Sequence, residues 1–191
     1  MLLLRLLGGL SLSMDGIRLT GPATQRHRLA LLALLAGARS KGQSRDRLVA
    51  WLWPERDSER ARNLLNQGVH ALRRTIGETA IISDQNDLRL DPVALACDVV
   101  AFEDAVAAGE LERAIALYTG PFLDGFHLPG TSEFEQWATG ERERLRRVYT
   151  RSLERLAESA EDRREWRAAA DRWRALVAEE PYDARTTLRL M

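Results

Sequence analysis

Seven polar side chains within residues 58–76 recur at the spacing of a single helix face. At about 100° of rotation per residue they lie together, and the apolar residues lie opposite them. The polar set comprises Arg62, Asn63, Asn66, Gln67, His70, Arg73 and Arg74. The apolar set comprises Ala61, Leu64, Leu65, Gly68, Val69, Leu72 and Ile76. The segment therefore predicts an amphipathic helix whose polar face forms hydrogen bonds and carries no negative charge.

These residue types suit the edges of DNA bases. Arginine pairs with O6 and N7 of guanine, and asparagine or glutamine pairs with N6 and N7 of adenine, in both cases through two hydrogen bonds. The nearby acids Glu55, Asp57 and Glu59 precede the helix or occupy its first turn, where they favour the helix dipole. An ordinary solvated helix is the alternative, but its surface would normally include Glu and Lys.

The elements around this segment have the order strands, three helices, hairpin. Strands are expected over Leu2–Leu7, Leu10–Ser13 and Ile17–Leu19. Helices are expected from Thr24 to about Ala38, from Ser44 to just before Pro54, and from Ser58 to Ile76, each with a capping residue at its start. The hairpin is expected over Ala80–Ser83 and Leu88–Leu90. This order predicts a winged helix, in which the second helix of the helix-turn-helix enters the major groove.

Several side chains are placed by this layout where DNA phosphates would lie, at the starts of the first two helices and in the wing. Backbone N–H groups at helix starts assist such contacts. The candidate phosphate contacts are Arg26, Arg28, Ser44, Arg45 and Arg89.

The formal net charge of the 191 residues is zero, but the charge is divided along the chain. Residues 1–97 carry a net charge of +5 and residues 98–191 a net charge of −5. This division of charge favours a polyanionic partner for the first half. Chance is the alternative, because it can produce an imbalance of this size. Hydrophobic residues make up 45% of the chain, which is enough for a packed core.

After Asp91-Pro92 almost every segment has the pattern of a helix. Leu111, Ala114, Ile115 and Tyr118 form a helical stripe that is typical of core packing, with a partner groove as the minority interpretation. Three tryptophans are expected to be core residues, with a role as interface anchors as the alternative: Trp137, Trp166 and Trp173.

No set of residues has the spacing of a catalytic or metal site. Cys97 is the single cysteine and is expected to be a buried structural thiol. His27, His70 and His127 lack the spacing of metal ligands, and Gln43 replaces the lysine that a phosphate-binding loop requires. We therefore expect no enzyme activity, no cofactor and no metal. The longest apolar run, Leu29–Ala36, is too short to cross a bilayer, so a soluble, cytoplasmic protein is expected.

Residues 3–91 resemble the OmpR-type winged helix of SARP-type antibiotic-regulatory transcription factors, most specifically at Trp51–Pro54 and Ala61–Arg74. The second half resembles the bacterial transcriptional activator domain that follows this winged helix in the family. Its marks are Asp98-Val99, Phe102-Glu103, the run Tyr118–Gly125, and Trp137 before Glu141–Arg147. A repeat frame from Thr150 places Ala169, Trp173 and Pro181 at positions that the tetratricopeptide repeat favours.

The resemblance implies a mainly α fold, with an α+β winged helix at residues 1–93 and an all-α, tetratricopeptide-like domain at residues 94–191. It also implies a sequence-specific transcriptional regulator, an activator, that binds double-stranded promoter DNA at direct repeats as a homodimer and contacts RNA polymerase. The rival hypothesis is a protein-interaction scaffold in which the winged helix is only an adaptor. An uncapped helix over Ala184–Met191 leads us to expect a fragment of a longer regulator.

Overall fold

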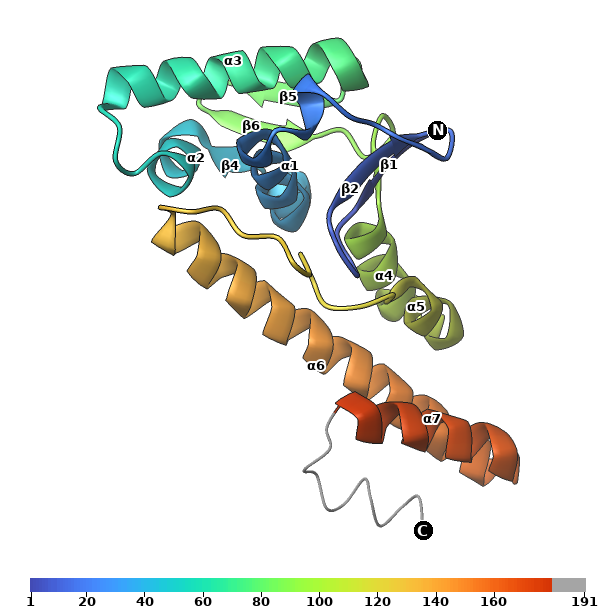
Figure 1. Ribbon diagram of the computed structural model, residues 1–191. Coiled ribbons are helices and arrows are strands. Elements are labelled where there is room, and N and C mark those ends of the chain that lie inside the picture. Colours follow the sequence, from blue (N-terminus) through green and yellow to red (C-terminus); the bar gives the residue numbers. More distant parts are fainter. Residues whose placement is uncertain (180–191) are drawn as a thin grey trace.

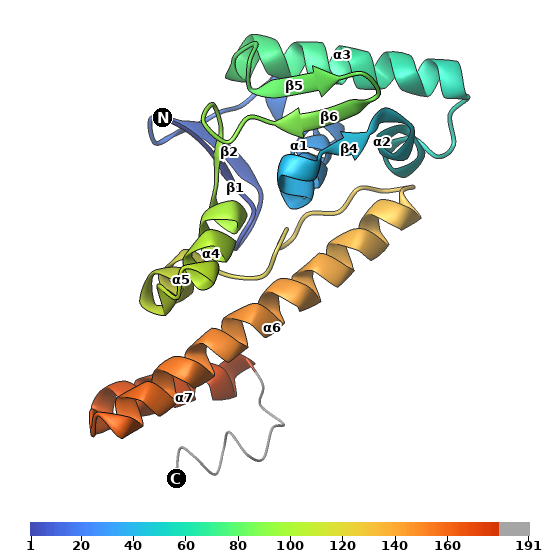
Figure 2. The same ribbon diagram turned by 180° about the vertical axis from the view of Figure 1, so that it is seen from behind.

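The computed structural model describes residues 1–179 (Figures 1 and 2). The first half supplies the helices α1 (Arg26–Ala38), α2 (Arg45–Leu52) and α3 (Ser58–Ile76). The second half supplies α4 (Asp98–Ala107), α5 (Leu111–Leu117), α6 (Ser132–Asp162) and α7 (Trp166–Glu179). Both views place α3 at one extremity of the molecule and the long helix α6 on the far side from it (Figures 1 and 2). The expected mainly α fold, with a winged helix followed by helices, is confirmed.

The first sheet has the strand order β3-β2-β1-β7. Its strands are β1 (Leu2–Arg5), β2 (Ser11–Met14), β3 (Ile17–Arg18) and β7 (Ala96–Cys97). Strands β1, β2 and β3, each overlapping a segment where a strand is expected, form an antiparallel meander, whereas β7 pairs in parallel with β1. The sequence did not predict β7, because two residues are too few to show an alternating pattern. The first sheet is therefore completed by a strand from beyond residue 93.

The second sheet has the strand order β4-β6-β5 and contains the expected hairpin. Its strands are β4 (Gln43–Ser44), β5 (Ile81–Asp84) and β6 (Asp87–Leu90). The hairpin β5–β6, which we call the wing, turns at Gln85-Asn86, and Gln85 has a positive φ of 46°. Leu88 and Leu90 of β6 are buried. Because successive side chains of a strand point to opposite faces, Arg89 lies on the other face of this sheet.

Most of the buried side chains belong to one hydrophobic core that both halves of the chain build. Leu31 and Leu34 of α1 contribute to it, as do Phe134 and Leu145 of α6. Trp137 of α6 contacts Trp51 of α2, with ring centroids 6.3 Å apart. This shared core does not test the division into domains at residue 93, which stays a prediction.

Gly37 of α1 is a point of close approach between the winged helix and α6. A Cβ atom built at this glycine would lie 2.9 Å from Cζ2 of Trp137, nearer than real Cβ contacts come. The absence of a side chain at position 37 therefore lets the indole of Trp137 lie directly against α1.

A second, smaller core joins α6 and α7. Ala169, Trp173 and Leu176 of α7 are buried against α6, and the indole N–H of Trp173 donates to Oε1 of Glu161 at 2.7 Å. The stripe of α5 is also in the core, since Leu111, Ala114 and Tyr118 are buried. These placements confirm the expectation for the α5 stripe and for Trp173 as core residues. Pro181 and the expected helix over Ala184–Met191 lie outside the described residues.

The prediction that Trp166 is a core residue is wrong, because its side chain is 65% exposed. Trp166 is the first residue of α7, and the buried positions of this helix begin at Ala169. The remaining tryptophan of the set, Trp137, is half-buried and packs against the main core.

Two of the three predicted helix caps are wrong by one residue each. Thr24 lies in a 3-10 turn (Pro22–Thr24), and α1 begins after Gln25 without a side-chain cap. Asp57 rather than Ser58 caps α3, since its carboxylate accepts the N–H of Arg60 at 2.9 Å. A carboxylate has the added attraction of its charge to the helix dipole. The third prediction is confirmed, because Oγ of Ser44 accepts the N–H of Arg47 at 3.3 Å.

No helix in the described part of the chain is long and apolar enough to span a membrane. Residues 1–179 also contain no group of three or more His, Cys, Asp or Glu side chains placed to hold a metal ion.

His27 of α1 predicts a pH dependence of stability. Its imidazole stacks on Trp53, with ring centroids 5.3 Å apart, and burial lowers the pKa of His27 despite a backbone hydrogen bond with Leu52. The unfolded chain therefore binds a proton at a higher pH than the folded chain does. Stability is full above the ordinary histidine pKa of about 6.5 and falls as the pH drops towards the lower folded value.

We expect the melting temperature to fall between about pH 7.5 and about pH 5.5, and the His27→Phe variant to show a smaller fall. Thermal melts followed by circular dichroism measure this difference. His70→Phe, at an exposed position, is the matched control and should keep the wild-type dependence. An unchanged pH dependence in His27→Phe would show that this ring is not responsible.

Candidate nucleic-acid interface

Helix α3 has the start and end signals that its sequence predicts, apart from the one-residue shift of its cap. Asp57 caps its first turn, which also contains Glu59, and Gly77 follows its last residue with a φ of 105°. Its inward face is held by six buried residues, Ala61, Leu65, Gly68, Val69, Leu72 and Ile76. Together these features fix the helix on α1 and α2. A surface that recognises a partner needs such a fixed support.

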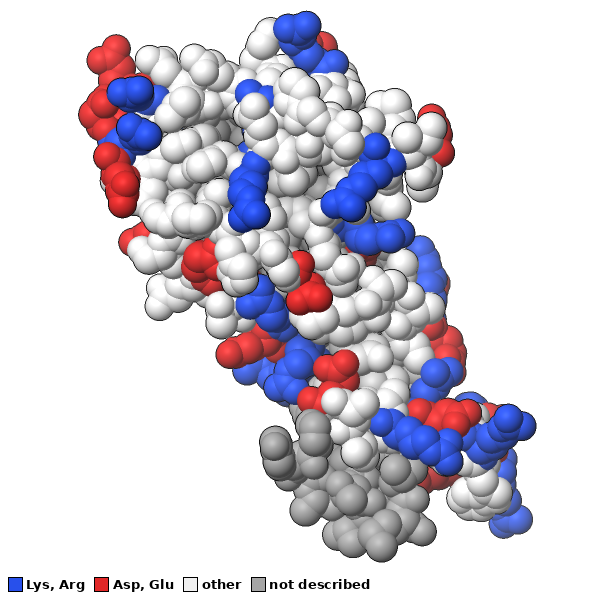
Figure 3. Space-filling model, in the orientation of Figure 1, with Lys and Arg blue, Asp and Glu red and all other residues white. Residues whose placement is uncertain are grey.

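The polar face of α3, formed by the seven residues from Arg62 to Arg74 named above, is directed to solvent. Six of these side chains are exposed and Arg73 is half-buried. The partition between an apolar and a polar side is therefore confirmed, with Leu64 half-buried at the boundary. Figure 3 shows acidic side chains gathered at the end of the molecule where α3 begins. The polar face itself contains none.

Arg73 joins α3 to the wing. Its guanidinium donates to the carbonyl oxygen of Ile81, at 3.1 Å from Nε and 2.7 Å from Nη2, and to Oγ of Ser83 at 2.9 Å. These bonds occupy the side chain and fix the wing beside the helix. The contact of Arg73 with bases stays a prediction, but in this structure the residue holds the wing against α3.

Arg45, at the start of α2, lies between α3 and the wing. Its guanidinium donates to Oδ1 of Asn66 at 2.8 Å and to Oγ of Ser83 at 3.3 Å. Its backbone N–H donates to the carbonyl oxygen of Asn86 at 2.8 Å. The predicted phosphate contact Arg45 and the predicted base contact Asn66 are thus brought together.

Asp46 is a residue of this surface that the sequence analysis missed. Its carboxylate accepts a hydrogen bond from Arg62 at 3.0 Å and one from Asn86 at 3.1 Å. These two bonds, with Arg62 the stronger influence, lower the pKa of Asp46. The Asp46 and Arg62 side chains are 61% and 62% exposed, so the ion pair contributes little to stability. The acid in the first turn of α2 was visible in the sequence, but nothing local identified its partners.

Four side chains of the polar face make no hydrogen bond or ion pair with any described residue: those of Asn63, Gln67, His70 and Arg74. Asn63, Gln67, His70 and Arg74 follow one another at intervals of three or four residues, so their side chains are neighbours along the helix. Their donors and acceptors therefore remain available to a partner.

The remaining predicted phosphate contacts lie in different places. Arg26 donates to the carbonyl oxygen of His127 at 2.7 Å, and Arg28 to that of Pro22 at 2.5 Å. Ser44 uses its hydroxyl to cap α2 and is half-buried. Arg89 does not join the α3 surface, because it lines a cavity with residues of α1 and α4. The role of each in binding phosphate stays a prediction.

The second half of the chain matches a known family. Residues 97–191 match the model of the bacterial transcriptional activator domain. The fold is similar to Mycobacterium tuberculosis EmbR, solved in complex with a low-affinity phosphopeptide, with a TM-score of 0.69, 25% sequence identity and 99% of this chain covered. The chain spans about half the length of the EmbR chain, 53%. No curated protein matches the sequence. The chain therefore belongs to the SARP-type transcriptional regulators, with a bacterial transcriptional activator domain in its second half.

Proposed function

We propose that this regulator binds double-stranded promoter DNA in a sequence-specific manner and reads the major groove with α3. The observation that carries the proposal is the exposed polar face of α3, which contains no acid and lies at one extremity of the molecule. A helix that protrudes in this way enters a major groove without collision from the rest of the chain. Helix α6 is on the far side and leaves this approach open (Figures 1 and 2).

Within this surface the residues have different roles. Asn63, Gln67, His70 and Arg74 read base edges directly, because their side chains are exposed and unengaged among the described residues. Arg62 and Asn66 reach bases after exchanging their protein partners, Asp46 and Arg45, for the DNA.

Arg26, Arg28, Ser44 and Arg45 are the proposed phosphate contacts. Arg26, Arg28 and Arg45 stand at the starts of α1 and α2, and Ser44 caps α2. The N–H groups of a helix start add to the attraction for phosphate. The fifth predicted contact, Arg89, lies on the face of the wing sheet opposite Leu88 and Leu90, and its role in binding phosphate stays a prediction.

The helical domain is proposed to contact RNA polymerase or a second protomer, so that two copies lie side by side on direct repeats and activate transcription. The part that contains α6 and α7 carries both signs of charge mixed together, unlike the polar face of α3 (Figure 3). A surface of mixed charge is poorly suited to DNA and better suited to protein.

A protein-interaction scaffold is the second candidate. The exposed Trp166 on α7 favours it, since tryptophan is enriched among the anchors of protein interfaces. The solved EmbR structure contains a phosphopeptide, so at least one protein of similar fold binds a peptide. In this case the polar face of α3 would have no nucleic-acid partner.

Sequencing of the genomic fragments that the purified protein retains tests the proposed function. We expect enrichment of a few sites near promoters, each with two copies of one half-site in the same orientation, about one helical turn or a multiple of it apart. Uniform retention of fragments, or none, would contradict sequence-specific binding. Single half-sites would contradict only the dimer.

A further inference from the structure

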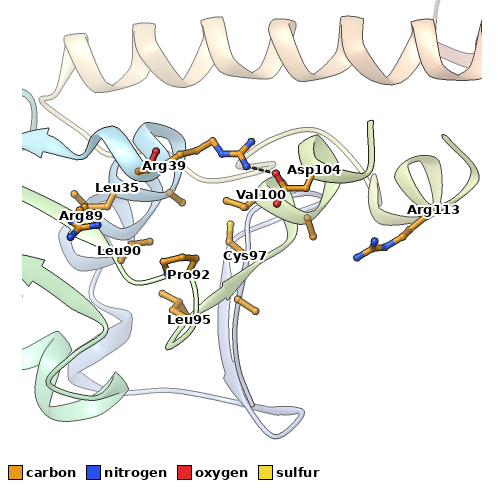
Figure 4. Close-up of a pocket in the computed structure, with 14 residues that line it drawn as sticks. Leu35, Arg39, Arg89, Leu90, Pro92, Leu95, Cys97, Val100, Asp104 and Arg113 are labelled. Atoms are coloured by element: carbon orange, nitrogen blue, oxygen red, sulfur yellow. Dashed lines mark hydrogen bonds and ion pairs between the residues drawn. The ribbon is translucent and has the colours of Figure 1, made fainter. Parts of the chain in front are cut away.

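A cavity of about 510 Å³ lies where the winged helix meets the start of the activator domain. One wall comes from the end of α1 and from β6, and the other from the segment that runs from Pro92 through β7 into α4. Figure 4 shows Arg89 towards one end of the cavity and Arg113 of α5 towards the other. The volume is within the range of sites that take small organic ligands, about 300–1,000 Å³.

The walls of the cavity are mainly apolar. Leu35, Leu90, Leu95 and Val100 line it together with the thiol of Cys97. Burial, with a smaller effect from the neighbouring Asp98, raises the pKa of Cys97 to about 12. The thiol is therefore neutral and unreactive at physiological pH, and it behaves as another apolar wall group.

The charged side chains at the mouth are mostly paired. Arg39 forms ion pairs with Asp104 and with Glu103, the latter at 3.3 Å, and Arg113 pairs with Glu110 at 2.7 Å. The Arg89 side chain is exposed, and its guanidinium makes no hydrogen bond or ion pair with any described residue. Asp104, the acid among the lining residues, is already occupied by Arg39. The mouth thus presents a guanidinium without a counterion beside an apolar interior.

We propose that this cavity binds a small organic anion, with its apolar body against Leu35, Leu95 and Val100 and its carboxylate on Arg89. A guanidinium matches a carboxylate through two parallel hydrogen bonds, which gives the site both its charge preference and an orientation for the ligand. A cationic ligand would find no unpaired acid among the described lining residues. The inference does not depend on DNA binding, because no residue of the polar face of α3 lines the cavity.

Occupancy of the site would stabilise the contact between the two halves. The walls belong to α1 and β6 on one side and to α4 on the other, so a ligand touches both at once. A ligand that binds only the folded chain raises its melting temperature as the ligand concentration exceeds the dissociation constant. The melting temperature therefore provides a second readout besides direct binding.

The test uses anilinonaphthalene sulfonate, a fluorescent anion with an aromatic body, added to the full chain. We expect saturable binding of one dye per chain, displacement by dodecanoate, and an increase in melting temperature with dodecanoate. Dodecylamine, which has the same chain with the opposite charge, should not displace the dye. Equal displacement by dodecylamine, or an absence of saturable binding, would overturn the proposal.

Two variants locate the site. Arg89→Gln should weaken dodecanoate binding by about three- to ten-fold, the range expected when a partly exposed ion pair is removed. Ala101→Phe, on the α4 wall, should fill the cavity and abolish dye binding. Arg155→Gln, an exposed arginine on α6 outside the cavity, is the control and should bind as the wild type does. If Ala101→Phe fails to fold, Arg89→Gln decides alone, and unchanged binding in it would refute the assignment.

Discussion

Alanine at both Asn63 and Gln67 is expected to remove the preference for the specific site while leaving weak, salt-sensitive binding to any duplex. Both amides are exposed on α3, their side chains have no partner among the described residues, and they lie one turn apart between the second turn and the middle of the helix. A bidentate contact of an amide with adenine is worth about 1–3 kcal/mol of discrimination. Removal of both amides should therefore reduce specific affinity by a factor on the order of tens to tens of thousands.

Fluorescence anisotropy measures this effect on a duplex selected by the wild type from a random-sequence pool and on a scrambled duplex. The matched control is Gln136→Ala, which removes an amide from α6 on the far side of the molecule. The control should bind both duplexes as the wild type does. If the double variant kept its full preference for the selected duplex, Asn63 and Gln67 would not be base-reading residues.

Replacement of Asp98 by alanine is expected to lower the free energy of unfolding by about 3–5 kcal/mol, the largest effect on stability that we expect. Its buried carboxylate accepts the backbone N–H of Leu6 at 2.9 Å, that of Leu7 at 2.9 Å and that of Val99 at 2.8 Å. Burial raises the pKa of Asp98, and the N–H donors act against that rise. Alanine would leave these donors buried without acceptors.

Urea unfolding of two further variants separates the effect of the missing acceptors from that of the missing volume. Asp98→Asn keeps the shape but turns one oxygen into a donor that faces an N–H, so it should also be destabilised. Asp124→Ala removes an exposed acid of the same domain and should change stability by less than about 0.5 kcal/mol. Wild-type stability of Asp98→Asn would contradict the role of the carboxylate as the acceptor that joins Leu6 and Leu7, just after β1, to the start of α4.

The features that the sequence predicted well are those whose signal is local and repeated. The 19 residues of α3 contain several turns of one periodic pattern, so both its limits and its two faces were predictable. The wing hairpin was likewise marked by alternating residues and a polar turn. Two-residue strands such as β4 and β7 carry no such pattern, and they form because of the strands beside them.

The features that the sequence missed depend on contacts between distant residues. The N–H donors of Leu6 and Leu7 are more than 90 positions from Asp98, so no local motif marks this acid. Arg73 had the correct periodicity for a base contact, but its bonds to Ile81 and Ser83 arise only when the wing folds against α3. Arg89 was predicted as a phosphate contact because it lies in the wing. Strand alternation places it on the face opposite Leu88 and Leu90, and the phosphate contact stays a prediction.

If α3 binds DNA as proposed, Asp46 holds part of its surface in place before the DNA arrives. In the free protein it holds Arg62 and Asn86, so an α3 side chain and the wing turn are joined through one carboxylate. An exposed ion pair of this kind is weak enough to be exchanged for a base or a phosphate. The chain has no net charge, but the basic groups near α3 have partners that can be replaced.

Duplex binding as a function of salt tests most directly the claim that this chain binds DNA through the α3 surface. The logarithm of the binding constant should fall linearly with the logarithm of the salt concentration, with a slope of about −3 for one protomer that uses Arg26, Arg28 and Arg45. Two protomers should double the slope, and Arg45→Ala should reduce it by about one unit per protomer. Weak duplex binding at every salt concentration would contradict the account and favour the scaffold.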